Sequence, residues 1–399
     1  MPKLEVRNLT KVFGPMPKKV LKLINNQQSK EEIFKETGHN IGVRKASFEV
    51  EEGTIFVVMG LSGSGKSTLI RCLNRLIEPT EGEILIDGKN ILTLNTKEMN
   101  EVKRDKLAMV FQSFALLPHR TIIDNVAFGL EIHGVKKEER RQKAKEILAL
   151  VGLEGYEESM PAELSGGMQQ RVGLARALAV DPDILLMDEA FSALDPLIRK
   201  QMQNELLTLQ SKMQKTIIFI THDLDEALNI GDTIAIMKDG EIIQIGTAEE
   251  ILSNPTNKYV RDFTENVNRA KVITASTIMK RTDVIVQAKD GVRSAIQKMK
   301  NASISSIYVL SKHRKLVGIV TIDDAMELLK TKKENLDIDD IIDTNVKTVL
   351  PDTPIEEIMP MFQESKYPIV VVDDNDKFMG IVFKASVISG ILGGETDET

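Results

Sequence analysis

The 399-residue sequence predicts an α/β domain followed by a smaller α+β module that is built from two similar units. Three observations predict this arrangement. Short apolar strands alternate with helical patterns over residues 1–265, a glycine-rich loop joins one of these strands to a helix, and a β-α-β-β-α pattern occurs twice near the C-terminus. The length also favours two or three domains over one.

Composition narrows the functional classes. The chain is 42% hydrophobic and 28% charged, as in ordinary globular domains, and its net charge of −7 argues against binding to a nucleic acid polymer. The N-terminus lacks a signal pattern, and no apolar run reaches the roughly 18 to 20 residues that span a bilayer. The single cysteine, Cys72, excludes an internal disulfide, and its apolar neighbours predict a buried core thiol.

The first predicted strand covers residues 4–9, and apolar alternation resumes at 46–50. Between them lies an unusual insertion at 15–40. Within it, Ser29 followed by Glu32 is a capping-box pattern, which predicts a short helix.

The rest of the first domain, 1–265, alternates strands with helices, which predicts a parallel sheet covered on both faces. A helical subdomain is expected at about 113–180. The predicted strands are 55–59, 184–187, 216–220 and 233–237, and the clearest helical patterns are 136–151 and 167–180.

The pattern weakens after 265, where we place the domain boundary. Beyond it, Gly-Ile-Val triplets begin at Gly318 and Gly380 in two units of similar order, which predicts a pseudo-symmetric pair. The expected segments are a linker at 266–277, repeats at 278–335 and 336–393, and an acidic tail at 394–399.

Residues 60–67, Gly-Leu-Ser-Gly-Ser-Gly-Lys-Ser, fit the phosphate-binding pattern G-x-x-x-x-G-K-[ST] between a strand and a helix. Glycines let successive backbone N–H groups turn toward phosphate oxygens. We expect Lys66 to reach the β- and γ-phosphates of ATP and the Ser67 hydroxyl to bind Mg²⁺. The residues predicted to surround the nucleotide phosphates are Gly60, Ser62, Gly63, Ser64, Gly65, Lys66, Ser67 and Thr68.

Two carboxylates, Asp188 and Glu189, follow the apolar strand 184–187. Phosphate sites form at the carboxyl edge of a parallel sheet, so Asp188 is placed to hold Mg²⁺ through water. Glu189 is then free to polarise the attacking water. A strand that ends in two carboxylates is common, so this prediction depends on its pairing with the phosphate loop.

Residues 164–171, Leu-Ser-Gly-Gly-Met-Gln-Gln-Arg, resemble the signature motif of ATP-binding-cassette (ABC) ATPases, which other phosphate-loop NTPases lack. The resemblance implies a P-loop NTPase cassette that hydrolyses ATP with Mg²⁺. The further contacts that it implies are Phe13 on adenine, the Q-loop Gln112 (also a Mg²⁺ ligand), the signature residues Ser165, Gly166, Gly167 and Gln169, the D-loop Asp195 and the switch residue His222.

The same resemblance implies that the enzyme works as a pair. Ser165 and the N–H groups of Gly166 and Gly167 begin a helix, which is an anion site. In ABC ATPases this site faces the γ-phosphate that the other subunit binds, so each ATP lies between two copies arranged head to tail. ATP is then expected to favour the closed pair. Lys66, Glu189 and His222 are the implied catalytic residues, with Glu189 as the base.

Over its whole length the chain resembles the ATPase subunits of glycine betaine/proline betaine importers, which are bacterial uptake systems for compatible solutes under osmotic stress. The insertion at 15–40, the stretch 111–119 and the C-terminal repeat carry this resemblance. It implies transmembrane permease subunits, an extracytoplasmic solute-binding protein reached through the permease, and a location on the cytoplasmic face of the membrane. The residues alone predict only an ATP-driven transporter.

The C-terminal repeat resembles paired CBS (cystathionine-β-synthase-type) domains, which often bind adenine nucleotides between their two units. Residues 318–324 fit the ribose-contacting pattern of that family, with Thr321 and Asp324 as the candidates. In the second unit Phe383 and Ser386 stand at the matching places, so one possible site lacks polar contacts. An adenosine-type ligand, including a cyclic dinucleotide, and a ligand-free dimerisation platform are the two alternatives.

Charges in this module suggest a sensor of ionic strength. The basic residues at 312–315, with Lys330, Lys332 and Lys333, could bind an anionic lipid surface or the acidic tail. The Debye length falls from about 10 Å at 0.1 M salt to about 3 Å at 1 M, so such a contact would loosen as ions accumulate. The alternative is that these are ordinary solvated charges.

Other functions stay open at this point. A soluble ABC ATPase of repair or translation would predict a long coiled-coil insertion or duplicated cassettes, and the sequence has neither. A nucleotide-sensing regulator with an inactive cassette would not need Lys66, Asp188, Glu189 and His222, which are all present. The ATPase of another importer is the remaining alternative within transport.

Overall fold

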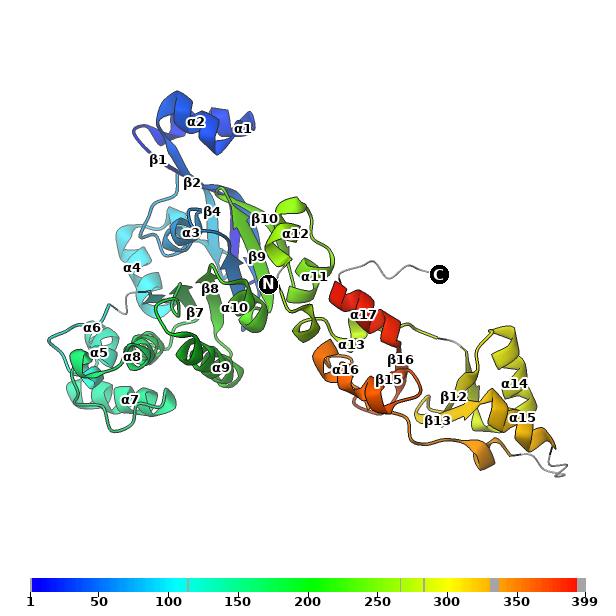
Figure 1. Ribbon diagram of the computed structural model, residues 1–399. Coiled ribbons are helices and arrows are strands. Elements are labelled where there is room, and N and C mark those ends of the chain that lie inside the picture. The colour runs from blue at the N-terminus through cyan, green and yellow to red at the C-terminus, as the bar shows by residue number, and fades with distance from the viewer. Residues whose placement is uncertain (1, 113–114, 266, 283, 331–336, 393–399) are drawn as a thin grey trace. The chain divides into compact units, whose positions relative to one another are not determined.

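The computed structural model describes residues 2–112, 115–265, 267–282, 284–330 and 337–392. The chain forms two compact units, Met1–Glu265 and Asn266–Thr399 (Figure 1). In the described part of the chain, every helix is too short or too polar to span a bilayer.

The first unit contains two sheets. Its strands are β1 (Leu4–Phe13), β2 (Asn40–Val50), β3 (Ile55–Met59), β4 (Glu81–Ile86), β5 (Lys89–Asn90), β6 (Leu107–Phe111), β7 (Ile184–Asp188), β8 (Thr216–Thr221), β9 (Thr233–Lys238) and β10 (Glu241–Gly246). One sheet has the order β10-β9-β3-β8-β7-β6, with β10 antiparallel at its edge and the other strands parallel. The other sheet, β2-β1-β4-β5, is antiparallel.

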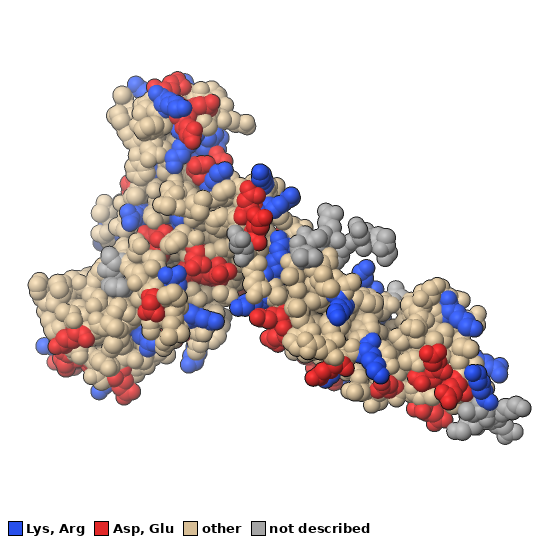
Figure 2. Space-filling view, viewed as in Figure 1, with Lys and Arg blue, Asp and Glu red and all other residues tan. Residues whose placement is uncertain are grey.

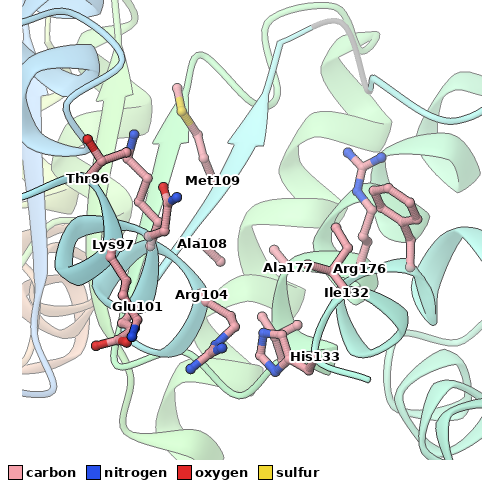
Figure 3. Close-up of a pocket in the computed structure, with 15 residues that line it drawn as sticks. Thr96, Lys97, Glu101, Arg104, Ala108, Met109, Ile132, His133, Arg176 and Ala177 are labelled. Atoms are coloured by element: carbon pink, nitrogen blue, oxygen red, sulfur yellow. The ribbon is translucent and has the colours of Figure 1, made fainter. Parts of the chain in front are cut away.

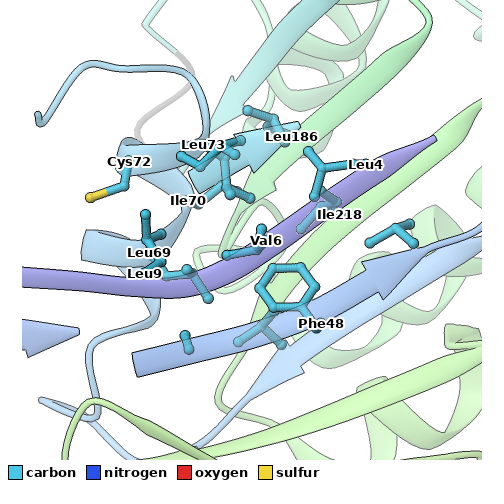
Figure 4. Close-up of a cluster of buried hydrophobic side chains, with 14 of the residues drawn as sticks. Leu4, Val6, Leu9, Phe48, Leu69, Ile70, Cys72, Leu73, Leu186 and Ile218 are labelled. Carbon is cyan, nitrogen blue, oxygen red and sulfur yellow. The ribbon is translucent and has the colours of Figure 1, made fainter. Parts of the chain in front are cut away.

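The parallel sheet that the sequence predicts is present, and the antiparallel sheet is an addition that the sequence analysis does not predict. Its long strands β1 and β2 bury apolar residues largely in alternation, which is typical of antiparallel strands with one solvated face. The helix α3 (Lys66–Leu73) contacts strands of both sheets, and buried side chains from all three layers form the main core (Figure 4). Cys72 is buried in this core as predicted, and burial raises the pKa of its thiol to about 12.

The helices between β6 and β7 form a lobe of their own (Figure 1). They include the two long helices that the sequence predicts at 136–151 and 167–180. The helices of the first unit other than α3 are α1 (Leu21–Asn25), α2 (Lys30–Thr37), α4 (Thr96–Asp105), α5 (Ile122–Val126), α6 (Phe128–Ile132), α7 (Lys137–Leu150), α8 (Gly166–Ala179), α9 (Pro196–Met213), α10 (Leu224–Ile230), α11 (Ala248–Ser253) and α12 (Lys258–Thr264).

The insertion forms α1 and α2 at the ends of β1 and β2 (Figure 1). The predicted capping box is present: the Ser29 side chain accepts from the Glu32 N–H, and the Glu32 carboxylate accepts from the Ser29 N–H. The Arg44 guanidinium anchors the insertion by donating to the Gln28 carbonyl at 2.7 Å. A small core of its own contains Val12, Val20, Ile24, Ile33 and Ile41.

The second unit contains two three-stranded sheets, β11-β12-β13 and β14-β15-β16, each with one parallel and one antiparallel pair. This is the repeated β-α-β-β-α order that the sequence predicts. The elements are α13 (Ala275–Ile278), β11 (Ile285–Gln287), α14 (Gly291–Asn301), β12 (Ser306–Leu310), β13 (Leu316–Thr321), α15 (Ile322–Lys330), β14 (Thr348–Val349), α16 (Ile355–Glu364), β15 (Ile369–Val372), β16 (Phe378–Val382) and α17 (Lys384–Leu392).

The two repeats share a core and are joined by isolated β-bridges. The Tyr308 hydroxyl donates to the Pro368 carbonyl at 3.0 Å. Ile319 of the first repeat bridges to Asp343 at the start of the second, and Lys280 at the start of the first bridges to Ile381 of the second. The shared core contains Tyr308, Leu310, Ile319, Val370, Val372, Phe378 and Ile381.

The segment 266–277, which the sequence predicts as a linker, differs from that expectation. Ala270, Ile273 and Ala275 are buried in the core of the second repeat, against Ile355 and Val387. These apolar residues give too short and too irregular a pattern to predict a core element from the sequence.

Candidate functional site

The parallel sheet brings the candidate catalytic residues to one edge. Register pairs Met59 with Thr221, Asp188 with Ile220, and Phe111 with Asp188. The carboxyl ends of β3, β8, β7 and β6 therefore lie side by side. The residues that follow or end these strands are the phosphate loop, His222, Asp188 with Glu189, and Gln112.

Two glycines of the phosphate loop have no room for a side chain. A Cβ at Gly60 would lie 2.1 Å from the Met237 carbonyl oxygen, and one at Gly65 would lie 2.1 Å from the Gly42 carbonyl oxygen. Both glycines also have positive φ values, 155° and 106°. The turn from β3 into α3 therefore requires glycine at both positions.

Lys66 is buried inside the loop. Its Nζ donates to the carbonyls of Gly60 at 2.8 Å and Leu61 at 3.2 Å, and lies 3.9 Å from Glu189 Oε1. Burial lowers the pKa of Lys66, and the neighbouring carboxylates of Glu189 and Asp188 act against that shift. The ammonium group is thus held where phosphate charge would replace the loop carbonyls as its partner.

The loop hydroxyls fit a polar ligand. The Ser64 oxygen is buried and has no hydrogen-bond partner among the described residues. Ser67 and Thr68, in the first turn of α3, are partly buried, and Ser62 is exposed at the tip of the loop. A buried hydroxyl without a partner is costly unless a ligand completes it.

The residues predicted to hold Mg²⁺ fit that ion. Ser67 Oγ donates to Asp188 Oδ1 at 3.0 Å, so two oxygen ligands meet beside the phosphate loop. Burial raises the pKa of the Asp188 carboxyl, while Ser67 and Arg71 act in the opposite sense. Among the described residues no group of three or more His, Cys, Asp or Glu could hold a metal. Mg²⁺ typically binds only a few protein ligands, and phosphates and water complete its coordination.

Glu189 occupies a strained backbone conformation. Its φ is +46°, in the left-handed region that glutamate seldom adopts. Its N–H donates to the Ile220 carbonyl at 3.1 Å, and its Oε2 lies 3.3 Å from His222 Nδ1. Strain of this kind is often found at functional sites, and here it directs the carboxylate toward both Lys66 and His222.

The Q-loop and D-loop candidates are joined through Ser192. Gln112 Nε2 donates to Ser192 Oγ at 3.0 Å, and Ser192 Oγ donates to the Glu189 carbonyl at 2.9 Å. Asp195 caps α9, since its Oδ1 accepts from the Ile198 N–H at 3.1 Å. Ser192 thus links the side chain of Gln112 to the backbone of Glu189 through two hydrogen bonds.

The signature residues begin α8. Ser165 is the N-cap, and Gly166 and Gly167 are the first two helical residues. Gly167 lies against α9, because a Cβ there would be 2.7 Å from Ile198 Cγ2. Gln169 Nε2 donates to the carbonyls of Pro161 and Leu164 and so holds the preceding loop. No hydrogen bond joins these residues to the phosphate loop within the described part of this chain.

Phe13 ends β1 next to the phosphate-binding helix. A Cβ at Gly42 would lie 2.7 Å from Phe13 Cε2 and 2.8 Å from Thr68 Cγ2, so the bare glycine lets the ring approach α3. The side chain is 39% exposed, and Lys11 Nζ lies 5.1 Å from its centroid. An exposed aromatic face beside the loop suits stacking on a base.

A cavity of about 900 Å³ separates α4 and β6 from α6 and α8 (Figure 3). Its walls are largely apolar, with Met109, Phe128 and Ile132 among them. Several cationic side chains, including Arg104 and Arg176, also line it. No sequence motif points to this cavity, because its lining comes from four separate segments.

A second cavity, of about 680 Å³, lies within the second unit between the two repeats. Thr321 and Phe383, which stand at matching places in the repeats, both line it, whereas Ser386 is buried. Asp324 binds the Thr321 hydroxyl at 2.5 Å, and Asp323 lines the cavity instead. Residues that the sequence did not single out also line it: Lys280, Arg281, Ser303, Tyr308, Lys366 and Tyr367.

Comparisons with known proteins agree on both units. The family profile described as ABC transporter matches residues 43–192, and that of the CBS domain matches 275–331 and 338–393. The chain is 56% identical to the glycine betaine/carnitine transport ATP-binding protein GbuA of Listeria monocytogenes, over 100% of this chain and 99% of that protein. It is 51% identical to the glycine betaine/proline betaine transport system ATP-binding protein ProV of Escherichia coli, over 98% and 97%.

Among solved structures, the first unit is similar to the dimeric structure of MJ0796, described as a bacterial ABC transporter cassette. The TM-score is 0.52 and the identity is 33%, with 61% of this chain and 98% of that chain covered. The similarity therefore extends over nearly the whole of that cassette.

Proposed function

This chain belongs to the ABC transporter family as an ATP-binding subunit with tandem CBS domains, and we propose that it energises uptake of glycine betaine or a related quaternary amine under osmotic stress. The observation that carries the ATPase function is the meeting of Lys66, Asp188, Glu189 and His222 at one sheet edge. The solute assignment depends on full-length similarity to betaine transport subunits, because the ATPase itself touches no solute.

In the proposed reaction a water molecule attacks the γ-phosphorus as the bond to the bridging oxygen breaks. Lys66 binds the β- and γ-phosphates, Glu189 accepts the proton of the attacking water, and His222 holds the γ-phosphate. When bound, Mg²⁺ would supply positive charge to offset the charge that develops on the phosphates. Ser67 and Asp188, with Gln112 from the neighbouring strand, are the residues proposed to hold the ion.

The proposed active form is a head-to-tail pair. The start of α8 offers the N–H groups of Gly166 and Gly167 to an anion, yet among the residues that the structure describes no hydrogen bond links it to the phosphate loop of its own chain. A second copy is therefore needed to place Ser165 and these N–H groups on the γ-phosphate. The similar cassette MJ0796 is described as dimeric, which supports a paired form.

The cavity beside α4 and α8 is proposed to receive a permease helix. Its apolar walls suit the apolar face of an amphipathic helix. β6, which contributes Ala108 and Met109 to the wall, ends one residue before Gln112. Docking of this kind places the subunit at the cytoplasmic face of the membrane, with the solute-binding protein reached through the permease.

Reconstitution with the permease tests the transport function. In proteoliposomes that also receive the solute-binding protein, we expect ATP-driven accumulation of glycine betaine, with carnitine and proline betaine as competitors. K66A will abolish accumulation because the phosphates lose their cation. Accumulation of none of these solutes would point to another importer, and failure to co-purify with any permease would point to a soluble ABC ATPase.

The cavity between the CBS repeats is proposed to bind an adenosine-type ligand, such as AMP, ATP or a cyclic dinucleotide. Tyr367 and Phe383 offer aromatic surface for a base, Thr321 offers a hydroxyl, and Lys280 and Arg281 offer cations for phosphate. The other outcome is a dimerisation platform that binds no nucleotide.

Thr321→Val will weaken this binding about tenfold, because the oxygen that can accept from the ligand is lost together with the hydrogen bond that the hydroxyl donates to Asp324. Calorimetric titration of AMP and cyclic di-AMP into the K66A background, where the cassette site is disabled, measures the effect. Thr348→Val, the same change at an exposed residue of β14, is the control. Equal affinity of the T321V and T348V variants would exclude this site.

Control by ionic strength through the charges of the second unit is also proposed. A free basic patch at 312–315 is not what the structure shows, because part of it is paired. Lys315 lies 3.5 Å from Asp376, so the basic turn at 312–315 meets an acidic turn of the second repeat. On the face in view, basic and acidic side chains are intermingled over the second unit (Figure 2). Lys332, Lys333 and the tail at 394–399 lie outside the described residues. Contact with anionic lipid would then depend on Lys330 and on Lys332 and Lys333 close to it in the sequence.

A further inference from the structure

Arg199, in the first turn of α9, connects two loops of the nucleotide site. Its Nη2 donates to the Leu194 carbonyl at 3.1 Å and to the Ser192 carbonyl at 3.4 Å. Its Nη1 donates to Asp223 Oδ2 at 3.2 Å. Ser192 and Leu194 lie in the stretch 192–195 that ends in Asp195 and resembles the D-loop, and Asp223 directly follows His222. One guanidinium group therefore joins the D-loop to the switch loop.

The surroundings of Arg199 favour a strong link. Its side chain is 25% exposed and that of Asp223 is 34% exposed, so solvent screens the pair only in part. The planar guanidinium can donate to several acceptors at fixed angles, which a lysine ammonium cannot match. The D-loop carbonyls and the Asp223 carboxylate are thus held in one geometry.

The start of α10 is fixed from α9 at a second point. Gln203, one turn beyond Arg199, donates to Glu226 Oε1 at 3.0 Å. The Glu226 N–H donates to Asp223 Oδ1 at 3.2 Å, and the Thr221 hydroxyl bonds the Glu226 carboxylate. Burial raises the pKa of the Glu226 carboxyl. These contacts hold Thr221 and Asp223, the residues on either side of His222, so the switch loop is tied to α9 at two points.

The same network reaches the Q-loop. Ser192 accepts from Gln112 through its hydroxyl and from Arg199 through its carbonyl. A continuous series of hydrogen bonds therefore runs from Gln112 through Ser192 and Arg199 to Asp223. It ends one residue from His222, whose ring faces Glu189. Gln112 is also the residue that follows the strand lining the proposed permease cavity.

We propose that Arg199 is a positioning residue, which holds the D-loop and the switch loop together so that His222 is aligned with Glu189 when Gln112 is in place. In this role Arg199 does not touch the nucleotide. The inference depends on the proposed function, because it concerns alignment for permease-coupled ATP hydrolysis. It predicts an effect on the chemical step and on stimulation by the permease, with little effect on ATP affinity.

The test compares variants of the full chain reconstituted with its permease. R199M removes the charge and keeps an unbranched side chain. We expect kcat to fall about tenfold or more and KM for ATP to change less than about twofold, as for an interaction that matters only in the transition state. R199K should recover part of kcat. K200M, at the exposed neighbouring residue, is the matched control and should leave both parameters unchanged.

A double-mutant cycle shows whether Arg199 acts through Asp223. D223N keeps an N-cap for α10 but removes the charge that pairs with Arg199. If the two residues act together, R199M/D223N will be no slower than R199M alone. Thermal unfolding identifies variants that fail to fold, and R199K and D223N keep the test decisive if R199M is one of them.

Three results would overturn the inference: kcat for R199M equal to that for K200M, a raised KM with kcat unchanged, or fully multiplicative effects in the cycle. K66A separates this inference from the proposed function. Turnover that survives in K66A contradicts ATP hydrolysis at the described site. An inactive K66A together with a fully active R199M contradicts only the role of Arg199.

Discussion

Replacing Glu189 with glutamine will lower steady-state ATP turnover by about 100-fold or more and will leave ATP bound between two copies of the chain. Glutamine keeps the size and the contact with His222, 3.3 Å away in the present geometry, but cannot accept a proton from water. Loss of a general base typically costs about 100- to 10,000-fold. The phosphate loop and the start of α8 are unchanged, so closure on ATP is preserved while reopening is blocked.

Phosphate release measures turnover, and gel filtration with and without ATP measures pairing. E49Q, the same substitution at an exposed residue of β2, controls for loss of a negative charge. Turnover of E189Q within a few fold of E49Q would remove Glu189 as the base. A monomeric E189Q in the presence of ATP would instead count against the paired form.

The sheet-edge site is the part that the sequence predicts best. Each of its pieces is continuous in the chain: the loop at 60–67, the carboxylates at the end of β7, and His222 after β8. Parallel strands present their carboxyl ends at the same edge, so local motifs become neighbours without any knowledge of side-chain packing. The repeats of the second unit could also be predicted, because two similar stretches of sequence fold into similar structures.

Features that depend on packing between distant segments could not be predicted in this way. Arg199 is one charged residue in an ordinary helical pattern, and only the fold brings it to Asp223 and the D-loop. Both cavities are lined from several separate segments. In the CBS cavity the sequence indicated Asp324, whereas the helix turn leaves Asp323 facing the space and Asp324 bound to Thr321.

Mixing two inactive variants will restore a complete nucleotide site if the pair is head to tail. K66A removes the cation of the phosphate loop. Gly166→Asp places a carboxylate at the start of α8, where it repels the γ-phosphate and competes for the N–H groups there. In the mixed pair, the intact loop of the Gly166→Asp chain faces the intact α8 of the K66A chain. If each loop used the signature of its own chain, both chains would stay defective.

Bound nucleotide gives the most direct measurement of this complementation. With Glu189→Gln present in both variants, so that bound ATP persists, each mixed pair should retain one labelled ATP, while either variant alone should retain almost none. Ala149→Asp, which adds the same carboxylate at an exposed residue of α7 in the helical lobe, should still trap two ATP molecules per pair in the same background. Since the complete site exists only across the two chains, an absence of retained ATP in the mixture means that the signature of one copy does not reach the phosphate bound by the other.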